Sequence, residues 1–168
     1  FEEGYIGNNV YRLINTASVP VLIMRPDIQI KRDLHKIMAP VDISFETLQK
    51  MRYSVELAKA FAAQIYLLGV ICPIDPETKH VINVQIHHAA NMCEQANVRY
   101  TAGSIETNTD PCQTILKYAK DIDANLVVVM REESESDFSA SSFTREILTT
   151  STMPLMIIPN VNAFSVGR

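Results

Sequence analysis

The sequence contains no run of basic residues and no long apolar segment. Its 168 residues include 15 Lys and Arg against 19 Asp and Glu, which gives a formal net charge of -4. No stretch could neutralise a row of phosphates, and this argues against nucleic acid as a partner. The longest apolar run, residues 126–130, is far shorter than the roughly twenty residues of a membrane-spanning helix. We therefore expect no membrane segment either.

Cysteine, histidine and catalytic motifs are equally sparse. Cys72, Cys93 and Cys112 have no CxxC spacing, so we expect three reduced thiols instead of disulfides or a zinc site. His80 and His87 share one helix face, but a metal site needs three or four converging ligands, so we predict no bound metal. No GxSxG, HExxH or P-loop lysine motif is present. These absences predict a protein that is not an enzyme.

The first residues carry no targeting signal. The chain begins Phe-Glu-Glu-Gly without an initiator Met, as if cut from a longer protein. A basic stretch followed by an apolar core, which would mark a signal peptide, is missing. We expect a cytoplasmic protein.

From residue 34 onward, short apolar runs alternate with longer amphipathic stretches. The apolar runs predict strands at residues 36–41, 65–71, 98–102, 126–130 and 153–159. Between them, apolar residues recur at steps of three and four, which predicts helices with one buried face. Helices between near-continuous apolar strands favour a doubly wound α/β domain, with a five-stranded parallel sheet covered on both faces.

Several residues indicate where these elements begin and end. Asp75-Pro76 and Asp110-Pro111 predict helix starts, because proline at the first helical position loses only an amide that had no partner. Gly103 predicts that the third strand ends at residue 102. Asp42 or Ser44 can cap the first helix of the domain through a side-chain oxygen.

The two ends of the sequence resemble each other. Residues 10–24 align with residues 144–158, with Pro20 on Pro154. The offset of 154 − 20 = 134 residues is about the length of one α/β domain. It predicts that residues 1–26 are the last helix and strand of a preceding copy, with a linker at 27–34, a complete domain at 35–160 and a tail at 161–168. The alternative is an N-terminal helix and strand that extend a single domain.

This repeat also predicts how the two ends meet. Each copy ends in Pro followed by apolar residues, and an apolar edge strand left open invites aggregation. We therefore expect residues 19–24 to lie antiparallel beside residues 155–158, related by a local twofold axis. We also expect a homo-oligomer in which Leu13 and Ile14 help to form the contact.

Taken in order, these segments resemble the universal stress protein family. The matching segments are residues 36–42, 65–70, Gly103 before Asp110-Pro111, residues 124–130 and residues 151–158. The resemblance implies the adenine-nucleotide alpha-hydrolase-like fold with strand order 3-2-1-4-5, and a tandem arrangement of which the first domain is truncated here. It also implies a non-catalytic role in stress response or regulation, and pairing between domains through their last strands. Some members bind ATP through the pattern G-x2-G-x9-G followed by Ser or Thr, after the fourth strand.

That glycine pattern is missing. No glycine lies between Gly103 and Gly167, and Arg131 and Ser134 stand where the first two glycines would be. A phosphate loop needs glycines so that several backbone N–H groups can reach the phosphates. Residues 131–137 instead carry four carboxylates against one cation, and two like charges about 4 Å apart cost on the order of 4 kcal/mol at an effective dielectric near 20. We therefore expect a degenerate nucleotide site, no required cofactor, and ATP and AMP disfavoured.

A vestigial site for a nucleotide or small anion is the alternative. The resemblance places Val41 and Asp42 at the base and ribose side of the family site. Ser139, Ser141 and Ser142 precede a predicted helix whose start could hold an anion. With these residues the chain would act as a ligand sensor. The competing interpretation is that Asp42 and the serines only cap helices.

Overall fold

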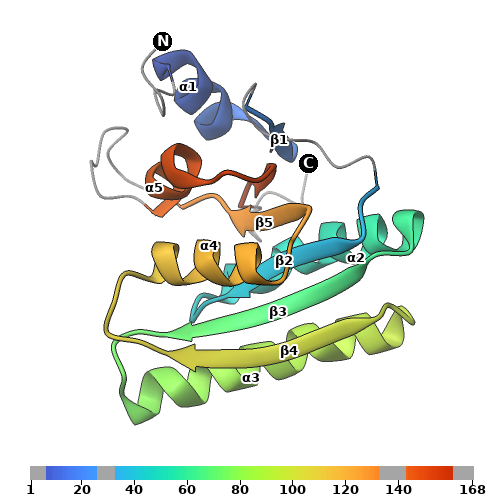
Figure 1. Cartoon of the computed structure of the whole chain (residues 1–168), viewed down its shortest axis with the longest axis vertical. Coiled ribbons are helices and arrows are strands. Elements are labelled where there is room, and N and C mark those ends of the chain that lie inside the picture. Colours follow the sequence, from blue (N-terminus) through green and yellow to red (C-terminus); the bar gives the residue numbers. More distant parts are fainter. Residues whose placement is uncertain (1–6, 26–32, 133–142, 161–168) are drawn as a thin grey trace, which may run out of the picture.

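The computed structural model describes residues 7–25, 33–132 and 143–160, which form helices and strands in alternation (Figure 1). The α-helices are α1 (Asn8–Thr16), α2 (Gln49–Phe61), α3 (Pro76–Gln95), α4 (Pro111–Asp121) and α5 (Phe143–Thr150), with a short 3-10 helix, η1 (Phe45–Leu48), before α2. The strands are β1 (Val21–Ile23), β2 (Lys36–Val41), β3 (Gln64–Ile71), β4 (Tyr100–Glu106), β5 (Leu126–Met130) and β6 (Leu155–Ile158). Within the described ranges, no helix is long and apolar enough to cross a membrane.

The six strands form one mixed sheet in the order β1-β6-β5-β2-β3-β4. The strands β2 to β6 pair in parallel, and β1 joins the edge antiparallel to β6. The described sheet therefore has one strand more than the five predicted, because β1 pairs with the last strand of the domain. Leu22 lies opposite Met156, and Val21 lies opposite Ile157, which is the antiparallel arrangement that the repeat predicts.

Helices cover both faces of this sheet (Figure 1). On one face, α2 and α3 contribute Met51, Val55 and Cys93 to a buried core. On the other face, α1, α4 and α5 contribute a second core with Ile14, Cys112, Ile115, Ala119, Ile147 and Leu148. The central strand β5 supplies both cores with alternate side chains, as a parallel strand buried on two faces must. This explains its uninterrupted apolar sequence.

The helix starts at the two Asp-Pro pairs are confirmed, but β4 is longer than predicted. Asp75 Oδ1 accepts a hydrogen bond from Thr78 N at 2.9 Å, and Asp110 Oδ2 accepts one from Gln113 N at 2.7 Å. The prediction that the third strand of the domain stops at residue 102 is wrong, because β4 continues through Gly103 to Glu106 along β3. β4 is an edge strand with mostly exposed side chains. Polar residues can therefore continue the strand after its apolar residues end, and the apolar pattern does not mark where its hydrogen bonding stops.

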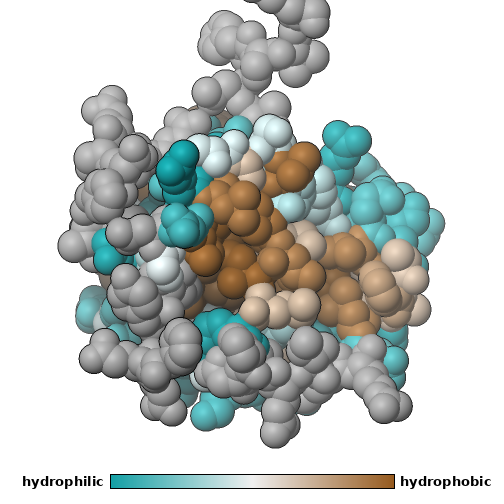
Figure 2. All heavy atoms as spheres, turned by 90° about the horizontal axis from the view of Figure 1, so that it is seen from above, coloured by the Kyte–Doolittle hydropathy of each residue, from teal (hydrophilic) through white to brown (hydrophobic). Residues whose placement is uncertain are grey.

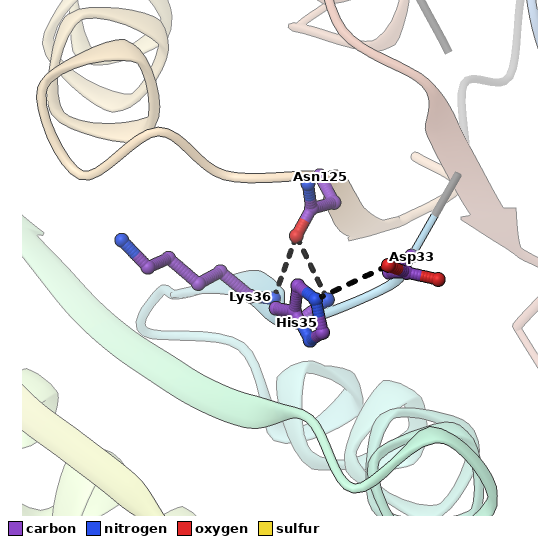
Figure 3. A network of polar contacts seen from close by, with 4 residues as sticks. All are labelled: Asp33, His35, Lys36 and Asn125. Atoms are coloured by element: carbon purple, nitrogen blue, oxygen red, sulfur yellow. Dashed lines mark hydrogen bonds and ion pairs between the residues drawn. The ribbon is translucent and has the colours of Figure 1, made fainter. Parts of the chain in front are cut away.

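Asn125 holds the amino ends of β2 and β5 together (Figure 3). Its side-chain Oδ1 accepts hydrogen bonds from His35 N at 2.9 Å and from Lys36 N at 2.8 Å. Its backbone N–H donates to Lys36 O at 2.9 Å. Lys36 Nζ donates to Ile122 O at 2.8 Å. The 3.7 Å contact between Asp33 and His35 joins two largely exposed side chains and adds little. These contacts set the register of the two central strands at the end opposite the pocket described next.

Candidate functional site

A pocket of about 730 Å³ opens at the carboxyl ends of β2, β3 and β5. The chain leaves β2 toward α2 on one face of the sheet and leaves β5 toward α5 on the other. Such a divergence between neighbouring parallel strands is where open α/β sheets bind their ligands. The volume also falls within the range of about 300–1,000 Å³ that is usual for small-molecule pockets.

The structure brings together two of the five predicted site residues. Val41, which is the last residue of β2, and Asp42 both line the pocket. Ser139, Ser141 and Ser142 lie outside the described residues. Of the predicted nucleotide or anion site, the structure therefore describes only the two residues on the β2 side.

The carboxylate of Asp42 forms hydrogen bonds with a residue two positions further along the chain. Its Oδ1 accepts hydrogen bonds from Ser44 N at 2.8 Å and from the Ser44 hydroxyl, an Asx-type turn just after the strand. The first residue before α2 is Leu48, and neither η1 nor α2 receives a side-chain cap. The predicted helix-capping role of Asp42 and Ser44 is therefore wrong, because η1 separates them from the start of α2.

Lys50 is a site residue that sequence reasoning missed. It lies on α2, lines the pocket and is only 1% exposed. Its Nζ donates to Thr47 Oγ1 at 2.8 Å, and the same oxygen accepts from Asp42 N at 3.2 Å. Burial lowers the pKa of Lys50 to about 8, although the charge of Asp42 acts in the opposite direction. Lys50, Ser54 and Ala58 recur at steps of four on the buried face of α2, but two of the three are polar, so the apolar pattern of the sequence did not mark Lys50 as buried.

Arg131, at the position of the missing first glycine, binds the end of α1. Its Nη1 donates to Ile14 O at 3.0 Å, Asn15 O at 3.1 Å and Ala17 O at 2.9 Å. A cation at these carbonyls is favourable, since a helix C-terminus carries partial negative charge. Sequence reasoning treated Arg131 only as an absent glycine. The structure gives it a partner 114 to 117 residues away.

Among the described residues, Asp110, Cys112 and Glu146 form a cluster of potential metal ligands. Burial, together with the negative charges of Glu146 and Asp110, raises the pKa of the Cys112 thiol to about 12. The pKa of Glu146 is also raised, by burial and by Asp110. Asp110 already caps α4 through Gln113 N, and acidic groups often lie together without a metal ion, so this cluster does not by itself indicate a metal site. His80 and His87 are both exposed.

Comparisons with known proteins are consistent with this fold. A family model described as "Universal stress protein family" matches residues 34–159. No curated protein sequence matches the chain. A universal stress protein from Archaeoglobus fulgidus in complex with dAMP superposes with a TM-score of 0.61 at 15% identity, over 77% of this chain and 99% of that one. One from Arabidopsis thaliana with AMP bound gives 0.57 at 18% identity, over 79% and 96%.

A third similar structure is a universal stress protein from Archaeoglobus fulgidus DSM 4304. It has a TM-score of 0.74 at 13% identity and covers 90% of this chain, which spans 54% of that longer protein. At these identities the solved structures show a shared fold and no more.

Replacing Lys50 by Met should stabilise the protein at neutral pH. The pKa of about 8 lies below the ordinary 10.5, so the charge is penalised fully below pH 8 and the penalty disappears as the pH rises through 10.5. A difference of this size corresponds to about 3 kcal/mol. We expect K50M to be about 1–3 kcal/mol more stable than wild type at pH 7, with the gap narrowing above pH 8. Urea denaturation at several pH values measures it.

Lys59→Met is the matched control, since Lys59 is an exposed lysine on the same helix. It should leave the pH dependence unchanged. The raised thiol pKa values of Cys93 and Cys112 lower stability above about pH 9 in every variant, so they cancel in the differences. If K50M were less stable than wild type at pH 7, the inference that the buried charge of Lys50 destabilises the protein would be wrong.

Replacing Arg131 by Met should loosen α1. Hydrogen bonds from a charged donor contribute about 1.5–3 kcal/mol, and each 1.4 kcal/mol is about a tenfold change in an equilibrium. We expect the α1 amides to exchange with deuterium at least about tenfold faster, while β2 and β5 keep their protection. Arg12→Met, an exposed arginine on α1 itself, should change nothing. Equal exchange in wild type and R131M would show that these bonds do not hold α1.

Proposed function

The chain belongs to the universal stress protein family, and we propose that it is a non-catalytic stress-response or regulatory domain that acts by domain pairing. Residues 35–160 form the family domain in this proposal. Residues 1–26 are equivalent to the last helix and strand of a preceding domain, and 27–34 are the linker. The partner is then a second universal-stress-type domain, or a second copy of this chain, at the edge where β1 and β6 meet.

The pairing register of β1 and β6 carries this proposal. The 134-residue offset between the two ends makes Leu22 equivalent to Met156, and these two residues lie opposite each other. The neighbouring pair is Val21 with Ile157. Replacing each of these residues by its equivalent in the other copy gives the pair on the opposite side of Leu22 and Met156, and that pair is also in register. A twofold axis between equivalent strands produces this self-complementary register.

The equivalent ends of α1 and α5 are also both bound by an arginine, although the two arginines do not occupy equivalent positions. The offset makes Asn15 at the end of α1 equivalent to Thr149 at the end of α5. Asn15 O accepts from Arg131 at 3.1 Å, and Thr149 O accepts from Arg25 at 3.0 Å. Each helix end is thus bound by an arginine that follows a strand of the other copy. The longer Archaeoglobus fulgidus protein supports the proposal too, because it covers 90% of this chain where the dAMP complex covers 77%.

Apolar residues on α1, on β1 and directly beside β1 supply a contact surface. Leu13 is 57% exposed, Val19 62%, Leu22 50% and Met24 50%. Figure 2, seen from the side of α1 and β1, shows apolar residues gathered in the middle of this face. β1 is one of the two edge strands of the described sheet, and an apolar edge favours pairing with another chain.

One expected contact residue is corrected. Ile14 is 2% exposed, because it packs into the core that α4 and α5 share with the sheet. The prediction that Ile14 helps to form an intermolecular contact is therefore wrong. Leu13, its exposed neighbour, stays a candidate.

Light scattering tests the pairing. We expect the chain to form a homo-oligomer at micromolar concentration, and Leu22→Lys to shift it toward monomer because a buried ammonium is costly. Phe45→Lys is the control: Phe45 is 89% exposed on η1, so the same charge is added away from β1. A wild-type chain that stays monomeric, or an equal effect of both substitutions, would rule out this surface as the contact.

The second candidate function is a ligand sensor. The pocket at the divergence of β2 and β5 favours it, and two of the similar structures hold dAMP or AMP. Against a nucleotide stand the absent glycines and the engagement of Arg131 with α1. We therefore keep the degenerate nucleotide site as the first proposal.

A thermal-shift titration with ATP and AMP separates the two functions. A ligand at 100 times its dissociation constant adds about 2.7 kcal/mol of stability. We expect no saturable shift with either nucleotide, because no glycine loop supplies backbone N–H groups to the phosphates. A saturable shift that Asp42→Ala abolishes would make the sensor the better description.

A further inference from the structure

A buried cation without an ion-pair partner lies against the pocket. Lys50 is 1% exposed, and its ammonium donates one hydrogen bond, to Thr47 Oγ1. The ion pairs found among the described residues, His35 with Asp33 and Lys79 with Glu106, do not include it. An ammonium has three donors, so two of them have no acceptor in the part of the chain that the structure describes.

This arrangement is unfavourable for the empty protein. Removing an ammonium from water costs free energy that a neutral hydroxyl such as that of Thr47 does not restore. The lowered pKa of Lys50 reports the same penalty. An anion placed beside Nζ would reduce this desolvation penalty. Binding of such a ligand is therefore favoured by the loss of the penalty as well as by its own contacts.

An acceptor without a partner lines the same pocket. Asn160 is a lining residue, and its Oδ1 is buried and accepts no hydrogen bond from the described residues. Buried polar atoms are nearly always paired. The lining thus offers a cation with free donors and an amide oxygen with no donor, which together match a ligand that carries both an anionic group and a donor.

The charges and walls of the pocket narrow the ligand further. Its described lining holds three carboxylates, Asp42, Glu46 and Glu132, against the cations Lys50 and Arg131. This excess of negative charge disfavours a ligand with several charges, such as a phosphate ester. Much of the remaining lining is apolar, from Val41 on β2 to Phe143 on α5. A ligand with a single charge and an aliphatic body fits these walls.

We propose that this pocket binds a small aliphatic amino or hydroxy acid, with its carboxylate on Lys50 and its N–H or O–H donor on Asn160. The two free donors of the ammonium match the two oxygens of one carboxylate. The proposal names a ligand class that the ligand-sensor alternative leaves open. It does not depend on the pairing of β1 with β6.

Calorimetric titration of the full chain with L-leucine and L-lactate tests the proposal. We expect saturable binding of at least one of these acids. K50M should weaken it by about tenfold or more, since one charge-assisted contact is lost. Lys59→Met removes the same charge from an exposed site on α2 and should leave the affinity unchanged. Asn160→Ala should also weaken binding.

A second readout separates direct contact from a general effect on the fold. The NMR signal of the Lys50 ε-carbon gives its pKa, which should rise when the carboxylate binds because an anion favours the charged form. No binding of either acid, equal binding by K50M, or an unchanged Lys50 pKa in the complex would overturn the proposal. Tighter binding of inorganic phosphate or AMP would overturn the ligand class. Light scattering on the same samples decides domain pairing independently.

Discussion

The hydrogen bonding of β2 to β5 at the middle of the sheet determines where the other elements lie. Ile37 pairs with Leu126 and Met38 with Val127, and Asn125 holds both strands at their amino ends. Because the chain then leaves the two strands toward opposite faces, their carboxyl ends separate into a pocket. Val41, Asp42, Arg131 and Glu132 lie at this pocket as a direct consequence.

The first residue after β5, Arg131, forms its contacts away from the sheet edge. A glycine there would leave the loop backbone open to phosphates, whereas Arg131 directs a guanidinium to the carbonyls at the end of α1. The same side chain borders the pocket. Arg131 therefore links the pocket to the edge where β1 pairs with β6. The ring centre of Tyr11 on α1 lies 5.3 Å from the guanidinium carbon of Arg145 on α5. This adds a cation–π contact between the two helices.

Lys50 changes the electrostatic interpretation of the pocket. The sequence suggests an acidic, anion-repelling loop after β5, but a buried ammonium contributed by α2 also lines the cavity. Repulsion of a triphosphate and attraction of a single carboxylate are compatible, because the first depends on total charge and the second on one close contact.

Local patterns in the sequence determined the alternation of helices and strands, the helix starts at Asp75 and Asp110, and, through the repeat, the antiparallel partner of β1. These features depend on residues a few positions apart or on copies of one motif. The extent of β4, the burial of Ile14 and Lys50, and the partners of Arg131 were decided by tertiary structure alone. Three of these four features depend on contacts with elements distant in the chain: β4 on β3, Ile14 on α4 and α5, and Arg131 on α1. The periodicity of one segment carries no information about which distant side chain removes it from water, so these features follow only from the packed fold.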